Sequence, residues 1–152
     1  MLNILLIGIG NEFRSDDGIG ILISRKIKQL NLPNIVVIEA SGEGSELIEL
    51  WKNQKFVIVV DAVNSGSKPG KIFKFDVTEQ SLPIKFFNYS SHAFGLAEAV
   101  EVSRKLGELP ERLLIYGIEG KNFSFGEKIS EKVIEASDHV INLIIERIKI
   151  EQ

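Results

Sequence analysis

Short apolar runs, separated by segments with helical periodicity, constrain the fold of this chain more than any other feature. Four runs are rich in Val, Ile, Leu and Phe, at positions 2–7, 35–38, 56–60 and 112–118. Runs of this kind are typical of strands buried on both faces, as in parallel sheets. A fifth run, 71–76, mixes polar and apolar residues and follows a turn-rich loop without a helix, so we expect a more exposed, antiparallel strand there.

Apolar residues recur at helical spacing in the segments between these runs. We predict helices over 19–30, around 47–51, from about Ser91 to Leu106, and from Ser130 towards the end of the chain. Asp16 is a candidate N-cap for the first helix. The alternation predicts a three-layer α/β domain with a mostly parallel sheet, and residues 1–152 contain no repeat or linker that would divide it.

The composition excludes several functional classes. The net charge of −3 disfavours a nucleic-acid partner, because such proteins usually carry a basic surface. The 152 residues include no cysteine, which excludes disulfides, thiolate catalysis and cysteine-based zinc sites. The apolar start lacks a basic leader and is too short to span a bilayer, so we expect a cytoplasmic protein that does not bind membranes.

Several polar residues follow the predicted strands, at the edge where ligands bind in open α/β sheets. They are Asp16 and Asp17 after the first strand, Glu39 after the second, Asp61 after the third, Glu119 after the last, and Ser91 and His92 at the predicted helix start. Each also has a structural interpretation. Asp16 or Asp17 could stabilise the helix N-terminus, Asp61 could cap a helix or solubilise a loop, and His92 could be structural. His139, in the last helix, is interpreted as structural or solvated.

Asp17, Asp61 and His92 together form a candidate metal site. Two carboxylates and one imidazole suit nickel or zinc, and three protein ligands leave positions open for water or substrate. A dinucleotide site is disfavoured, because Phe13 stands where the third glycine of the G-x-G-x-x-G fingerprint belongs. The two aspartates at the same helix start would also repel a pyrophosphate.

The chain resembles the hydrogenase maturation endopeptidases. The resemblance is carried by Gly8-Ile9-Gly10-Asn11, Asp16-Asp17-Gly18-Ile19-Gly20, Val59-Val60-Asp61-Ala62, Ser91-His92, Gly117-Ile118-Glu119 and Phe125-Gly126. Their order and spacing cover nearly the whole sequence. The resemblance implies an α/β/α sandwich around a twisted, mostly parallel five-stranded sheet with one antiparallel strand.

The resemblance also implies an activity: removal of the C-terminal extension from the large-subunit precursor of a nickel–iron hydrogenase after nickel insertion. The family's metal-contacting residues match Asp17, Asp61 and His92, which are predicted as both catalytic and metal-binding. The nickel is then supplied by the substrate and serves recognition. No organic cofactor is implied, and we expect a monomer.

The sequence departs from the family pattern at two places. Glu39-Ala40-Ser41-Gly42 stands where an aspartate and a glycine-threonine turn are common, which puts a functional role for Glu39 in doubt. Asp17 occupies a position where glutamate is also common, and its shorter side chain could alter the metal geometry.

Two other functions fit part of the sequence pattern. Peptidyl-tRNA hydrolases share the Gly-x-Gly-Asn turn, but they carry a histidine soon after it, where this chain has Phe13-Arg14-Ser15. A metal-sensing binding module or chaperone for the large subunit would need the same three ligands as the protease. In the protease, a nearby carboxylate would assist water attack on the amide, either as a general base or through the metal, and the sequence leaves both routes open. A covalent acyl-enzyme is disfavoured, although Ser90 and Ser91 precede His92.

Overall fold

The computed structural model describes residues 3–87 and 92–151. Its five strands form a single sheet in the order β2-β1-β3-β5-β4. The strands are β1 (Ile4–Ile9), β2 (Ile35–Ala40), β3 (Phe56–Val63), β4 (Ile72–Asp76) and β5 (Arg112–Glu119). The β1–β2, β1–β3 and β3–β5 pairs are parallel, and β4 runs antiparallel to β5. These pairings confirm the predicted sheet, including its one antiparallel edge strand.

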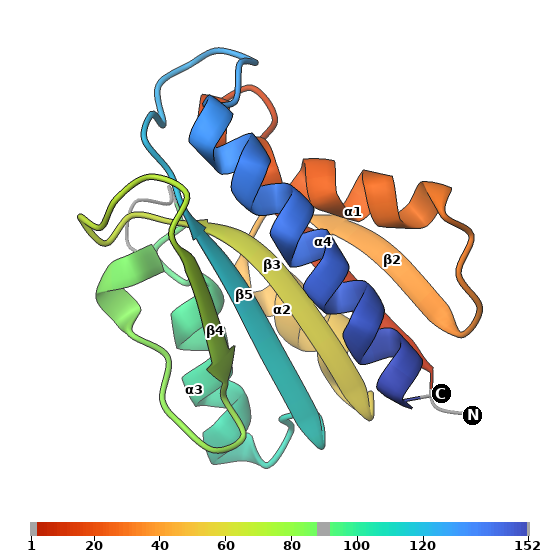
Figure 1. The fold of residues 1–152 in the computed structure, drawn as a ribbon. Coiled ribbons are helices and arrows are strands. Elements are labelled where there is room, and N and C mark those ends of the chain that lie inside the picture. The colour runs from red at the N-terminus through yellow and green to blue at the C-terminus, as the bar shows by residue number, and fades with distance from the viewer. Residues whose placement is uncertain (1–2, 88–91, 152) are drawn as a thin grey trace.

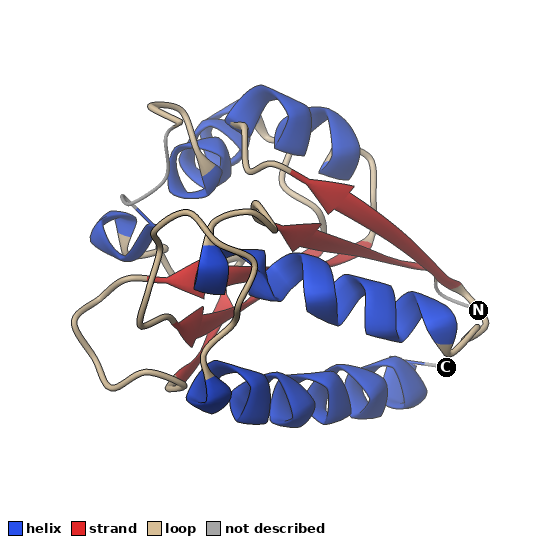
Figure 2. Ribbon diagram, turned by 90° about the horizontal axis from the view of Figure 1, so that it is seen from above, coloured by secondary structure: helices blue, strands red, loops and turns tan. Residues whose placement is uncertain are grey.

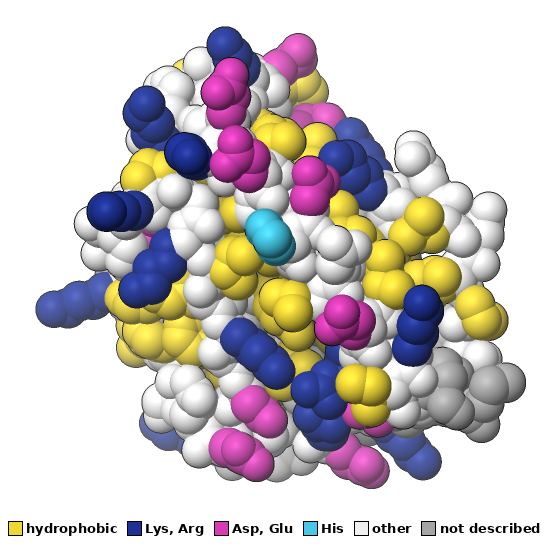
Figure 3. Space-filling view, in the orientation of Figure 1, with side chains coloured by type: hydrophobic (Ala, Val, Ile, Leu, Met, Phe, Trp, Pro, Cys, Tyr) yellow, Lys and Arg dark blue, Asp and Glu magenta, His cyan; other side chains and the backbone are white. Residues whose placement is uncertain are grey.

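Helices cover both faces of the sheet, as Figures 1 and 2 show. They are α1 (Ile19–Gln29), α2 (Gly44–Trp51), α3 (Leu96–Leu106) and α4 (Glu131–Glu151), with 3-10 turns at Ser15–Gly18 and Ile84–Phe87. α1 and α4 pack on one face of the sheet, and α2 and α3 pack on the other. The predicted three-layer α/β/α sandwich is confirmed. Basic and acidic side chains are interspersed on the face that α4 presents to solvent (Figure 3).

The inner strands are buried because helices cover their apolar side chains on both faces, whereas β2, at one edge of the sheet, is only partly buried. All six residues of β1 and all eight of β3 are buried, as the near-continuous apolar runs predict. β4 is more exposed and lies at the edge of the sheet, also as predicted. None of the helices within the described ranges is long and apolar enough to cross a membrane.

Three elements near the candidate site, β1, β3 and α3, have boundaries that differ from the sequence expectations. β1 begins and ends two residues later than predicted, and Gly8 lies inside it, paired with Glu39 on one side and Val60 on the other. β3 continues past Asp61 to Val63, because β5 supplies parallel partners as far as Glu119. Asp61 therefore lies within the strand, and Glu119 is the last residue of β5.

The third difference concerns the segment that leads into α3. The expected helix start at Ser91 falls outside the described residues, and α3 begins at Leu96. Gly95 is extended, and the carbonyl of Phe94 accepts a hydrogen bond from the Gly44 N–H at 2.8 Å. This bond ties the segment to the start of α2, so the chain becomes helical only afterwards.

The sheet order creates a switch point at the carboxyl edge. From β1 the chain goes to β2 on one side and then crosses to β3 on the other side. Open α/β sheets bind ligands where the direction of winding reverses in this way. Asp17 follows β1 and Asp61 lies near the end of β3, so the two aspartates flank the switch point.

Candidate active site

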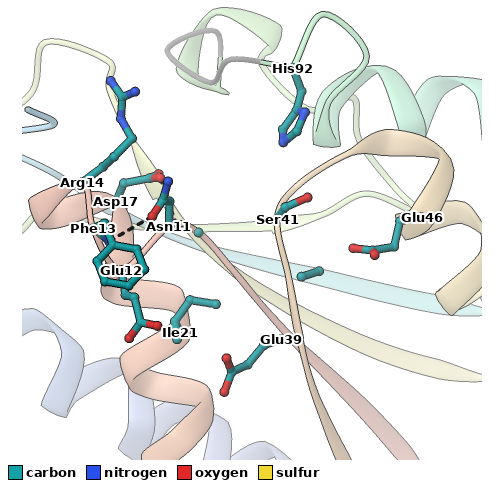
Figure 4. Close-up of a pocket in the computed structure, with 12 residues that line it drawn as sticks. Asn11, Glu12, Phe13, Arg14, Asp17, Ile21, Glu39, Ser41, Glu46 and His92 are labelled. Atoms are coloured by element: carbon teal, nitrogen blue, oxygen red, sulfur yellow. Dashed lines mark hydrogen bonds between the residues drawn. The ribbon is translucent and has the colours of Figure 1, made fainter. Parts of the chain in front are cut away.

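A cavity of about 370 Å³ opens at the carboxyl edge of the sheet. The turn after β1 and the segment between β2 and α2 form most of its wall, and His92 completes it (Figure 4). Its lining residues are Gly10, Asn11, Glu12, Phe13, Arg14, Asp17, Ile21, Glu39, Ala40, Ser41, Glu46 and His92. Two of the three predicted site residues, Asp17 and His92, therefore share one cavity.

Asp17 enters the cavity from the 3-10 turn that precedes α1. Its Oδ2 accepts a hydrogen bond from the Asn11 N–H at 3.0 Å, which orients the carboxylate towards the turn after β1. The Asn11 side chain in turn accepts a bond from the Phe13 N–H at 2.9 Å. The glycine-asparagine turn thus shapes the backbone around Asp17.

His92 faces Asp17 from the opposite side of the cavity, as Figure 4 shows. It lies in the loop before α3, which begins at Leu96, and not at the predicted helix start. Gly42 lies beside it: a Cβ added there would be 3.9 Å from His92 Cδ2 and 3.0 Å from Ile9 Cγ2. The absence of a side chain at Gly42 leaves the imidazole close to the end of β1.

Glu43 adds a negative charge near His92. Its carboxylate caps α2 by accepting bonds from the Ser45 and Glu46 N–H groups, both at 2.9 Å. These bonds, with a smaller contribution from the nearby His92 ring, lower the pKa of Glu43. The Glu43 carboxylate therefore stays charged at the start of α2.

Asp61 does not line the cavity and is buried, with 5% of its surface exposed. Its Oδ1 accepts a hydrogen bond from the Ala62 N–H at 2.8 Å. Strand alternation places it on the α2–α3 face with Val59 and Val63, and the turn carrying Asp17 packs against the same strand. Asp61 therefore lies in the strand next to the turn that carries Asp17, and not among the residues that line the cavity.

The described parts of the chain contain no group of three or more His, Asp or Glu side chains placed to hold a metal ion. Asp17, Asp61 and His92 therefore do not form a ready-made three-ligand cluster among these residues. Their assignment to catalysis and to nickel contact stays a prediction.

The other acidic candidates have structural partners. Asp16 is completely buried, and the predicted N-cap role on the first helix was wrong: its carboxylate binds backbone N–H groups of the loop before α4. Glu119 is also buried and accepts bonds from the backbone N–H and hydroxyl of Ser65. His139 is exposed on α4, in agreement with a solvated residue.

Sequence reasoning missed the ion-pair network on the cavity wall. Arg25 of α1 binds Glu39 through Nε at 2.8 Å and Nη2 at 3.0 Å, and it reaches Glu12 through Nη1 at 2.8 Å. The hydrogen bonds from Arg25 lower the pKa of Glu39. The spacing of Arg25 on the helix gave no signal of this contact, because Glu12 and Glu39 come from separate segments.

Comparison with known proteins decides the family. The family model described as hydrogenase maturation protease matches residues 21–147. A Methanocaldococcus jannaschii protein named as a candidate hydrogenase maturation protease is 34% identical over 154 residues, covering 97% of each chain. The chain belongs to the hydrogenase maturation protease family.

Other relatives agree with this membership. The hydrogenase 2 maturation protease of Escherichia coli is 31% identical over 121 residues, covering 77% of this chain and 73% of the relative. The solved structure of the E. coli hydrogenase maturating endopeptidase HybD has a TM-score of 0.81 at 21% identity, over 99% of this chain and 94% of that one. A solution structure of an E. coli endopeptidase gives a TM-score of 0.84 at 24% identity, with the same coverage. The family is one of peptide-bond hydrolases, as the resemblance in the sequence implied.

Proposed function

We propose that this chain removes the C-terminal extension of a nickel–iron hydrogenase large-subunit precursor once nickel is in place. Asp17 and His92 face one cavity at the switch point of the sheet, and Asp61 lies on the adjacent strand. This arrangement supports the proposal, because the chain is a member of the maturation protease family. The enzyme acts as a cytoplasmic monomer, and the large subunit is its protein substrate.

The nickel of the substrate is the recognition signal. Asp17 and Asp61 supply carboxylate oxygens and His92 supplies an imidazole nitrogen, a donor set that suits nickel. Contact with the metal needs a neutral imidazole and ionised carboxylates. Since Asp17 and His92 approach from opposite sides, a metal between them would hold the adjoining extension within the cavity.

Cleavage needs a water molecule and an acceptor for its proton. A carboxylate facing the cavity accepts a proton as the water oxygen attacks the carbonyl carbon of the scissile amide. The same group then returns that proton to the amide nitrogen, which leaves as an amine when the C–N bond breaks. In this proposal Asp17 is the general base, which is supported by its position in the cavity lining and its hydrogen bond from the Asn11 N–H.

The decisive experiment compares nickel-loaded and nickel-free precursor as substrates. The wild-type chain should shorten only the loaded form, seen as a loss of mass from the large subunit. Cleavage of both forms at equal rates would show that the protease does not need nickel to recognise its substrate. Binding without any loss of mass would make the chain a metal-sensing binding module.

Variants of the three residues test their roles. Asp17→Asn, Asp61→Asn and His92→Ala should each slow processing by about 100-fold or more, in line with loss of an acid–base or ligand group. Asp138→Asn and His139→Ala are matched controls, because both residues are exposed on α4, and they should process at the wild-type rate. Melting temperatures close to wild type would show that the folds are intact. A variant with full activity would exclude its residue from the site.

A further inference from the structure

Two loops from opposite ends of the chain are joined beside the cavity. The turn after β1 and the segment before α4 lie side by side in Figure 1, and a bridge pairs Arg14 with Gly126. The Ser15 N–H donates to the Gly126 carbonyl at 2.7 Å, and the Gly126 N–H donates to the Phe13 carbonyl at 2.9 Å. The Ser15 hydroxyl donates to the Ser124 carbonyl at 2.8 Å.

The buried Asp16 carboxylate holds the base of these loops. Its Oδ2 accepts bonds from the N–H groups of Lys121 at 2.7 Å and Asn122 at 2.9 Å. The Ser130 N–H and hydroxyl bind the same carboxylate at 2.7 and 2.8 Å. Four hydrogen bonds to one charged group therefore fix the position of the segment before α4 relative to the turn after β1.

This scaffold presents apolar side chains to solvent. Phe13 is 56% exposed and Phe125 is 83% exposed. The Arg14 guanidinium carbon lies 5.2 Å from the centre of the Phe125 ring, at cation–π distance. Phenylalanine and arginine are both enriched in the buried centres of protein interfaces, and arginine is also enriched among the residues that contribute most binding energy. We call Phe13, Arg14 and Phe125 the aromatic rim.

We propose that the aromatic rim docks the folded body of the substrate protein; this inference rests on the proposed function. Phe13 and Arg14 also line the cavity, so the rim is continuous with the site that receives the extension. A cavity of about 370 Å³ holds only a few residues, so the rest of a large substrate lies outside it, against its rim. The complementary surface offers an apolar pocket for the rings and a carboxylate for Arg14.

Kinetics of Phe125→Ala test the rim, because Phe125 does not line the cavity. The KM for nickel-loaded precursor should rise about tenfold or more, as for an interface hot spot, with kcat close to wild type. The melting temperature should be unchanged, since the ring is largely exposed. Ile150→Ala is the matched control: Ile150 is 72% exposed near the C-terminal end of α4, and both constants should stay at wild-type values.

The outcomes separate this inference from the proposed function. An unchanged KM in Phe125→Ala, or a loss confined to kcat, overturns the docking rim and leaves the protease intact. If the wild-type chain cleaves no precursor, the proposed function fails. A direct titration of precursor binding then tests whether the aromatic rim docks the precursor. Weaker binding of Phe125→Ala supports the rim and equal binding overturns it. If the substitution instead dissociates a wild-type dimer in sedimentation, the rim is a contact between copies of this chain, which also overturns the proposal.

Discussion

Asp16 and Asp17 are neighbours in the sequence, yet their carboxylates point to different parts of the molecule. Asp17 faces the cavity, whereas Asp16 is completely buried and binds the loop before α4. The 3-10 turn separates the directions of adjacent side chains, so one carboxylate is available to the site while the other holds the turn in place. A structural and a proposed functional role therefore coexist within two residues.

Asp16→Asn should lower the free energy of unfolding by about 2–4 kcal/mol. The new amide presents its NH₂ group to the backbone N–H donors of Lys121, Asn122 and Ser130, and some of these donors lose their acceptor. Urea unfolding followed by circular dichroism measures the change. Asp138→Asn, on the exposed face of α4, should stay within about 0.5 kcal/mol of wild type. An equally small effect at Asp16 would contradict its role as the anchor of both loops.

Close packing of α1 on the sheet positions the site at the scale of secondary structure. Gly20 lies in the first turn of α1, where an added Cβ would overlap the Ile9 carbonyl oxygen and lie 2.5 Å from that of Val60. Both atoms belong to the backbone and cannot move aside cheaply. The helix therefore approaches β1 and β3 closely, and this approach sets the position of the turn that carries Asp17.

Gly20→Ala should destabilise the protein by about 3 kcal/mol, the upper range for overpacking a well-packed core. The extra methyl group pushes α1 away from the sheet, so processing activity should fall together with stability. Chemical denaturation and the precursor cleavage assay measure the two effects. Lys28→Ala, at an exposed position of the same helix, should leave both unchanged. A Gly20→Ala protein as stable as wild type would show that the helix can shift without cost.

At the scale of the whole molecule, one sheet separates two apolar cores. The chain's single tryptophan, Trp51, is completely buried in the core under α2 and α3. Its indole Nε1 donates to the Ser103 hydroxyl at 3.0 Å, which links the two helices. The other core lies under α1 and α4, and the same strands contribute side chains to both.

Because the two cores share their strands, the molecule should unfold in one cooperative step. Trp51 fluorescence should shift to longer wavelength with the same urea midpoint as the loss of far-ultraviolet circular dichroism. A fluorescence transition at clearly lower urea would show that the α2–α3 layer unfolds separately.

Much of the fold could be predicted from the sequence, because burial leaves a local record. The apolar runs at 35–38 and 56–60 correspond to β2 and β3, and the mixed run at 71–76 corresponds to the antiparallel edge strand. The position of Asp17 at the carboxyl edge also followed from the order of elements. Each of these features depends on the pattern of apolar and polar residues over a short stretch of the chain.

The partners of the polar residues could not be predicted in the same way. Asp16 binds groups more than 100 residues away, and Arg25 joins Glu12 to Glu39. The segment that carries His92 is not helical, because the Phe94 carbonyl binds the Gly44 N–H at the start of α2. The sequence by itself determined which segments form strands and helices and in what order they follow. Only the tertiary structure decided which charges meet, because those contacts depend on loops whose closure joins distant segments, and local patterns carry no record of them.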